Sequence, residues 1–210
     1  MNKKLLHPMA LLPVFFTGAA LAGGGSAELK VTGEIAPSSC VVNVADSKMY
    51  WEGLKPSMLS AHSNTPLDYK MTKVTLQCQD QVIPSFRVID NRAGTESESQ
   101  PGHFGLGNIN GTGKVGFYTA RTSMAAVDNQ EVGMFMDNSG SGGRPMLTLE
   151  NGGTFRWATF GQTSPMAGKD FSFDLIITPT LASAAVMEGV PATGETLMDG
   201  SMTMEFRFGV

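Results

Sequence analysis

Apolar and polar residues alternate with a period of two in short stretches along most of this chain. In the clearest stretch, Phe171–Ile177, the residues Phe171, Phe173, Leu175 and Ile177 share one face. Glycine, proline, asparagine and aspartate separate such stretches, as expected where strands end in turns. Further candidate strands are Val74–Cys78, Ser85–Ile89, Val115–Thr119, Cys40–Val44, Glu131–Met136, Met146–Leu149 and Phe155–Phe160. Many short strands predict an all-β fold, an antiparallel β-sandwich.

The first 22 residues differ from this pattern and predict a secretory signal peptide. Two lysines precede an apolar run from Leu5 to Leu21, and Ala20-Leu21-Ala22 is a small-x-small cleavage site. A retained membrane anchor is the weaker interpretation, because two prolines interrupt the run and it is short for a bilayer span. We therefore expect residues 1–22 to be removed and the mature chain to be exported into the periplasm.

The charge balance argues against nucleic acid as a partner. Without the two lysines of the leader, the chain keeps 13 basic against 19 acidic residues, and no Lys/Arg cluster remains. Phosphate contacts need clustered positive charge. The length of the mature chain is that of a single domain with a core of its own.

The chain has two cysteines, Cys40 and Cys78. An even pair in an exported protein predicts a disulfide, which would stabilise the fold by roughly 3–4 kcal/mol in the chain-entropy model. A metal site would need more cysteines or histidines nearby. Only His62 and His103 remain beyond the leader, so we expect no metal.

Both ends of the mature chain alternate clearly. Near the N-terminus, within residues 28–35, the apolar face consists of Leu29, Val31, Gly33 and Ile35. Near the C-terminus the corresponding face consists of Met202, Met204, Phe206 and Phe208. Alternation alone is equally consistent with two ordinary edge strands of one sheet.

One connection, Asp90–Gly113, is long, polar and rich in glycine. A loop of this length in a compact domain is uncommon and is often functional. The alternative is a disordered excursion of the chain.

These features resemble the subunits of chaperone–usher fimbriae. In that family an alternating N-terminal segment with a central glycine precedes the first cysteine, and a second cysteine ends a later strand, as Thr75-Leu76-Gln77-Cys78 does here. The family also ends in an alternating strand with an aromatic residue near the terminus, a position that Phe208 fills. Fimbrial subunits usually have a tyrosine one residue from the end, whereas Gly209-Val210 follow Phe208 here.

The middle of the chain resembles a particular branch, the GltF-type exported fimbrial proteins. The matching segments are Asp90-Asn91-Arg92-Ala93-Gly94, Phe104-Gly105-Leu106-Gly107 and Lys114-Val115-Gly116-Phe117-Tyr118. Asp199-Gly200-Ser201-Met202-Thr203 fits this branch as well.

The resemblance implies an incomplete immunoglobulin-like sandwich, residues 37–210, that lacks its final strand. Residues 23–36 would be a donor-strand extension that completes a neighbouring subunit, with Gly33 at a shallow point of the groove that receives it. The implied partners are a periplasmic chaperone, an outer-membrane usher and other fimbrial subunits. The implied function is structural, in a surface fimbrium that contributes to cell adhesion.

Two kinds of cofactor chemistry have weak signals in the sequence. Gly111-Thr112-Gly113-Lys114-Val115-Gly116 has a dinucleotide-binding spacing but no strand before it and no helix after it. The pairs Met134/Met136 and Met202/Met204 offer thioethers that can bind copper(I), but strand spacing favours core packing.

A hydrolase triad is also weakly indicated. His103 and Asp90 lie in one loop with serines, without a nucleophile elbow. We therefore predict no catalytic residues, no enzyme activity and no cofactor.

Two other functions remain open. The chain could be a minor or tip adhesin subunit, although a tip adhesin usually carries a separate lectin domain for which there is no room. It could also be a free periplasmic binding protein that uses the 90–113 loop and is stable without a chaperone.

Overall fold

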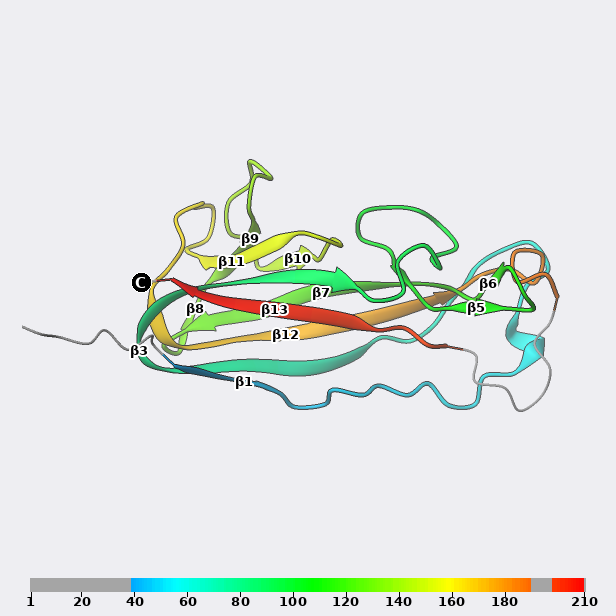
Figure 1. Cartoon of the computed structure of the whole chain (residues 1–210), viewed down its shortest axis with the longest axis horizontal. Helices are drawn as coiled ribbons and strands as arrows, with labels where there is room; N and C mark the ends of the chain where they lie inside the picture. The colour runs from blue at the N-terminus through cyan, green and yellow to red at the C-terminus, as the bar shows by residue number, and fades with distance from the viewer. Residues whose placement is uncertain (1–38, 190–197, 210) are drawn as a thin grey trace, which may run out of the picture. The chain divides into compact units, whose positions relative to one another are not determined.

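The computed structural model describes residues 39–189 and 198–209, all within one unit, Pro37–Val210 (Figure 1). These residues form β-strands that pair antiparallel, and one short 3-10 helix, η1 (Pro56–Met58). In this part of the chain no helix has the length and apolar character needed to cross a membrane.

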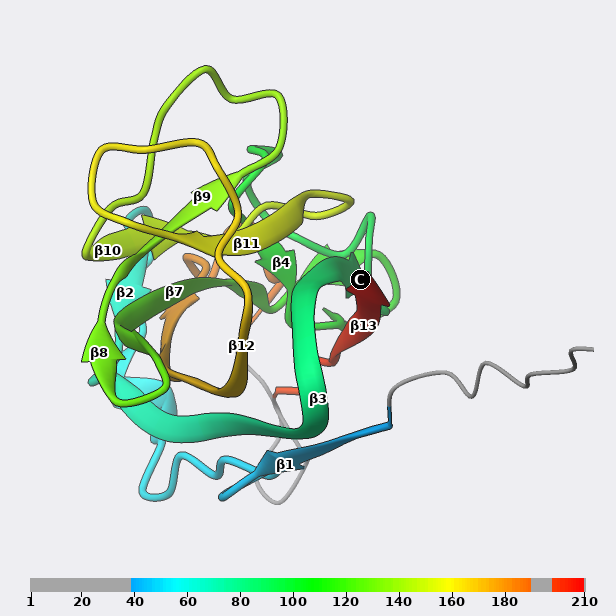
Figure 2. The same ribbon diagram turned by 90° about the vertical axis from the view of Figure 1, so that its left-hand side faces the viewer.

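Strand β3 (Lys70–Asp90) is the centre of the sheet. Its first half pairs with β1 (Cys40–Val44) and β12 (Gly168–Leu181), and its second half pairs with β11 (Thr154–Ala158) and β13 (Met202–Gly209). Figure 2 shows β3 curling between the two halves. The fold is therefore a curled antiparallel sheet with two arms that share one strand.

Further strands extend both arms. In the first arm β12 pairs with β7 (Gly116–Val127), and in the second arm β11 pairs with β9 (Gly133–Met136). The remaining strands are short: β2 (Thr65–Pro66), β4 (Phe104–Gly105), β5 (Asn108–Ile109), β6 (Gly113–Lys114), β8 (Gln130–Glu131) and β10 (Met146–Thr148).

The predicted strands Val74–Cys78 and Ser85–Ile89 are the two halves of β3. The chain stays extended through the polar run Gln79-Asp80-Gln81 that lies between them. What changes there is the partner, because Val82 still pairs with β12 whereas Ile83 already pairs with β13. Continuity of β3 is what joins the two arms.

The core lies between the arms, where aromatic side chains from both meet. Phe86 of β3 stacks on Phe173 of β12 at 5.2 Å and on Phe155 of β11 at 5.5 Å between ring centroids. These three side chains are fully buried. The indole N–H of Trp157 donates to the carbonyl of Ser172 at 3.2 Å, which satisfies its only polar group. Of the predicted inward face, Phe171, Phe173 and Leu175 are buried, and Ile177 is half-buried against the core.

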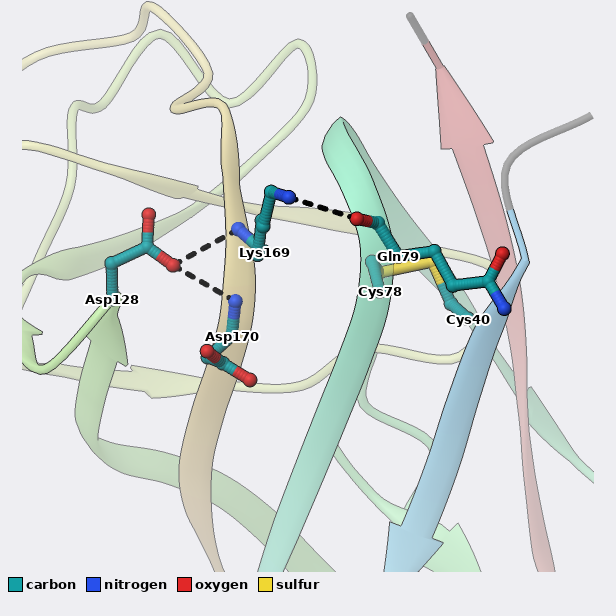
Figure 3. Close-up of a disulfide and its surroundings, with 6 residues drawn as sticks. All are labelled: Cys40, Cys78, Gln79, Asp128, Lys169 and Asp170. Carbon is teal, nitrogen blue, oxygen red and sulfur yellow. Dashed lines mark hydrogen bonds between the residues drawn. A yellow bond between two sulfur atoms is a disulfide. The ribbon is translucent and has the colours of Figure 1, made fainter.

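The predicted disulfide between Cys40 and Cys78 is present (Figure 3). The two cysteines are directly opposite each other in the β1–β3 ladder, with Cα atoms 4.1 Å apart. The bond fixes β1 to the first half of β3.

Asp128 holds the start of β12 next to this disulfide region (Figure 3). Its Oδ1 accepts the backbone N–H groups of Lys169 and Asp170, each at 2.9 Å. These two hydrogen bonds lower the pKa of the Asp128 carboxyl below its usual range.

Candidate functional site

An apolar groove lies beside the start of β13. It encloses about 900 Å³. One wall consists of Met198, Met204 and the residues Gly200–Met202. The other wall is the chain that follows β1, mainly residues 46–59, and the buried side chains at the base are Leu106, Tyr118, Pro179 and Leu181.

Strand β13 contributes Met202 and Met204 to the first wall and matches the predicted C-terminal strand. It pairs with β3 over its full length, from Met202 opposite Asp90 to Gly209 opposite Ile83. Among residues 39–189 and 198–209, no strand pairs with its second edge. The apolar side chains of β13 are half-buried and pack against the core, namely Met202, Met204, Phe206 and Phe208.

The second wall is an extended segment held by side chains. Within the described ranges, residues 45–55 belong to no strand. Trp51 donates its indole N–H to the carbonyl of Asp68 at 2.8 Å, and Lys70 donates its ammonium group to the carbonyl of Tyr50. The Lys70 ammonium also lies 5.4 Å from the centroid of the Trp51 ring, a cation–π contact.

Five methionines line the groove: Met49, Met58, Met198, Met202 and Met204. Methionine is unbranched and flexible, so it adapts its shape to whatever packs against it. The Met202/Met204 pair, weighed above as a copper ligand, is half-buried against the core. In the part of the chain that the structure describes, no three His, Cys, Asp or Glu residues form a group suited to a metal ion.

Tyr118 lies at the base of the groove. Its ring stacks on Phe104 at 5.2 Å between centroids and is almost completely buried. Burial, and then the nearby Asp90 carboxylate, raise the pKa of Tyr118 well above its usual range. The phenol therefore stays protonated and uncharged.

The 90–113 segment is held in a defined shape by hydrogen bonds among its own residues. The buried Asp90 carboxylate accepts the N–H of Arg92 at 2.8 Å and the N–H of Gly105 at 2.9 Å. Thr95 Oγ1 donates to the carbonyl of Arg92 at 2.8 Å and accepts the N–H of Gly107 at 3.0 Å. The structure thus brings the two motifs of the segment into contact.

Glycine is required where these motifs touch. A Cβ on Gly105 would collide with the carbonyl oxygen of Arg92, and Gly107 has a φ of +96°. Gly94 also has a positive φ, and Phe104 is fully buried. The motif residues Asp90, Arg92, Gly94, Phe104, Gly105 and Gly107 therefore build one packed turn.

The residues weighed above for catalysis and nucleotide binding make ordinary structural contacts. His103 stacks on Phe117 at 3.7 Å between ring centroids, and its Nδ1 is 3.1 Å from the carbonyl oxygen of Glu98, whereas the Asp90 oxygens accept backbone amides. Of the glycines in residues 111–116, Gly113 lies in β6 and Gly116 begins β7, so the segment leads into a strand and not into a helix. Neither feature forms part of the groove.

Some of the site residues predicted from the sequence lie in the part of the chain that the structure describes, and others do not. The candidate donor residues Leu29, Val31, Gly33 and Ile35 lie outside the described residues. Sequence reasoning missed the second wall, since residues 45–59 have no periodic pattern. The concentration of Met49, Tyr50, Trp51 and Leu54 in an unpatterned stretch was the available signal.

Neither a scan against protein-family models nor a search of curated proteins found a match to this chain.

Proposed function

We propose that this chain is a structural subunit of a chaperone–usher fimbria whose groove accepts a strand from another subunit. The supporting observation is the apolar groove of about 900 Å³ beside β13, a strand whose second edge has no partner within the described residues. In this proposal the Pro37–Val210 unit is an incomplete immunoglobulin-like sandwich. An extended donor segment adds the strand that it lacks.

Strand addition suits the two kinds of group that the groove presents. The free edge of β13 offers backbone N–H and C=O groups to a new strand, and the groove beside the start of β13 offers apolar side chains against which that strand can pack. Burying the three side chains of Leu29, Val31 and Ile35 would contribute about 5–9 kcal/mol in gross terms. That gain is comparable to the whole stability of a typical domain, about 5–15 kcal/mol.

The donor in this proposal is the segment 23–36 of a second subunit, after removal of the signal peptide. A periplasmic chaperone would cover the groove first, and the outer-membrane usher would exchange the chaperone strand for the donor. The result would be a surface fimbrium with a role in adhesion and no catalysis. The rival, a free binding protein using the 90–113 loop, gains no support from a loop whose motif groups bond to one another.

A peptide with the sequence of residues 26–36 tests this function directly. Trp51 lines the groove, so its fluorescence should change when the peptide binds to the purified chain. A peptide of the same composition in scrambled order should bind at least tenfold more weakly, because it loses the alternation. Equal binding of the two peptides would contradict strand acceptance.

A further inference from the structure

The turn Asp90–Thr95 is bonded to the residues that lead into β13. The Arg92 guanidinium holds two atoms of one residue, since Nε donates to the carbonyl oxygen of Asp199 at 3.0 Å and Nη2 donates to its Oδ2 at 2.5 Å. Backbone and side chain of Asp199 are thus fixed together. A planar guanidinium with donors in two directions is suited to such a contact.

Asn91 holds the next residues in the same way. Its backbone N–H donates to the carbonyl of Ser201 at 3.0 Å. Its side-chain amide donates to Ser201 Oγ at 2.9 Å and to Thr203 Oγ1 at 3.0 Å. Together, Asn91 and Arg92 contact three residues of the segment 199–203.

The segment 199–203 also contacts the motif Phe104–Gly107 and Tyr118. The N–H of Asp199 donates to the carbonyl of Leu106 at 2.9 Å. Gly200 packs so closely that a Cβ there would lie 2.9 Å from the Tyr118 ring. The Asp90 and Phe104 motifs therefore enclose the same short piece of chain, which is distant from both of them in the sequence.

The Arg92–Asp199 ion pair contributes little to the stability of the fold, but it lies beside residues that line the groove. The Arg92 and Asp199 side chains are 40% and 66% exposed, and exposed ion pairs stabilise a protein only weakly. Yet Met198 and the residues Gly200–Met202, on both sides of Asp199, line the groove. If the wall is already ordered, binding of a strand does not include the entropic cost of ordering the wall.

We propose that Asn91 and Arg92 are positioning residues for strand acceptance, which hold residues 198–202 as a preformed wall of the groove. This inference rests on the proposed function, and its main consequence is kinetic. Without the Arg92 contacts the wall must be ordered while the strand binds. Ordering one residue lowers the population of the competent state roughly 5- to 30-fold.

The test compares the binding rates of the 26–36 peptide in stopped-flow measurements of Trp51 fluorescence. Arg92→Ala should lower the association rate constant about 5- to 30-fold, while the melting temperature changes little. The matched control is Arg156→Ala, which removes a similar ion pair to Asp137 at 2.9 Å, with both side chains about 30% exposed and away from the groove. This control should bind the peptide within twofold of the unmodified chain.

Three further variants keep the test decisive if Arg92→Ala folds poorly. Asn91→Ala leaves the ion pair intact and should also slow association. The exchange Arg92→Asp with Asp199→Arg should restore part of the rate that Arg92→Asp alone removes, a rescue that a general loss of stability does not produce. Association rates within twofold for all variants, with normal peptide binding, would overturn the positioning role and leave the proposed function standing. Failure of the unmodified chain to bind the peptide would instead contradict the proposed function.

Discussion

The most direct consequence of the proposed function is that this chain should be stabilised by its own donor strand. The change is to delete residues 26–36 from the N-terminus and place a copy of Ser26–Ala36 after Val210 through a flexible linker. Strand β13 ends at Gly209, so a strand that follows it through a short flexible linker can run back antiparallel along its second edge. The copy can therefore reach the groove within the same molecule.

The size of the effect follows from the groove. Three buried side chains contribute about 5–9 kcal/mol in gross terms, and ordering the strand offsets part of this. A net gain of about 3 kcal/mol would raise the melting temperature of a chain of this length by roughly 6–12 °C. Thermal unfolding by circular dichroism, together with size-exclusion chromatography, measures stability and association in one comparison.

Substitutions within the copy distinguish specific binding of the strand in the groove from a non-specific effect of a longer C-terminus. Gly33→Leu should remove most of the gain, because a large side chain would enter a shallow part of the groove. Thr32→Val, on the opposite face of the strand, should leave the gain intact. If the unmodified mature chain is already a stable monomer and the copy changes its melting temperature by less than about 2 °C, the donor-strand reasoning is refuted.

Three other predictions concern the described residues. Replacing both cysteines, Cys40→Ser with Cys78→Ser, should lower the free energy of unfolding by roughly 2–5 kcal/mol, and a reducing agent should then have no further effect on denaturant curves. The pKa of Asp128 is lowered by its two backbone hydrogen bonds, so its contribution to stability is present above the unfolded-state pKa and is lost as the pH falls through the folded-state value. The stability difference between the unmodified chain and Asp128→Asn should therefore shrink as the pH falls below about 4, and a constant difference down to pH 2 would contradict this. Mild oxidation of methionine to the polar sulfoxide should weaken binding of the 26–36 peptide, and the combined change Met198→Leu, Met202→Leu and Met204→Leu should reduce that sensitivity.

The sequence by itself determined the local structure of this protein. Alternation over a few residues locates the middle of β12 and most of β13 and assigns their inward faces, because a strand repeats every two residues. The disulfide could also be predicted from the sequence, because two cysteines in a chain with a predicted signal peptide are expected to pair.

Only the tertiary structure decided how these strands combine. The sequence predicts two separate strands, Val74–Cys78 and Ser85–Ile89, yet β3 is continuous, because its backbone pairs with β12 before the bend and with β13 after it. The role of Asn91 and Arg92 was equally hidden, since their partners lie more than 100 residues further along the chain. Periodicity is a property of neighbouring residues, whereas the groove and the contacts around its wall depend on which distant edges the curl of β3 brings together.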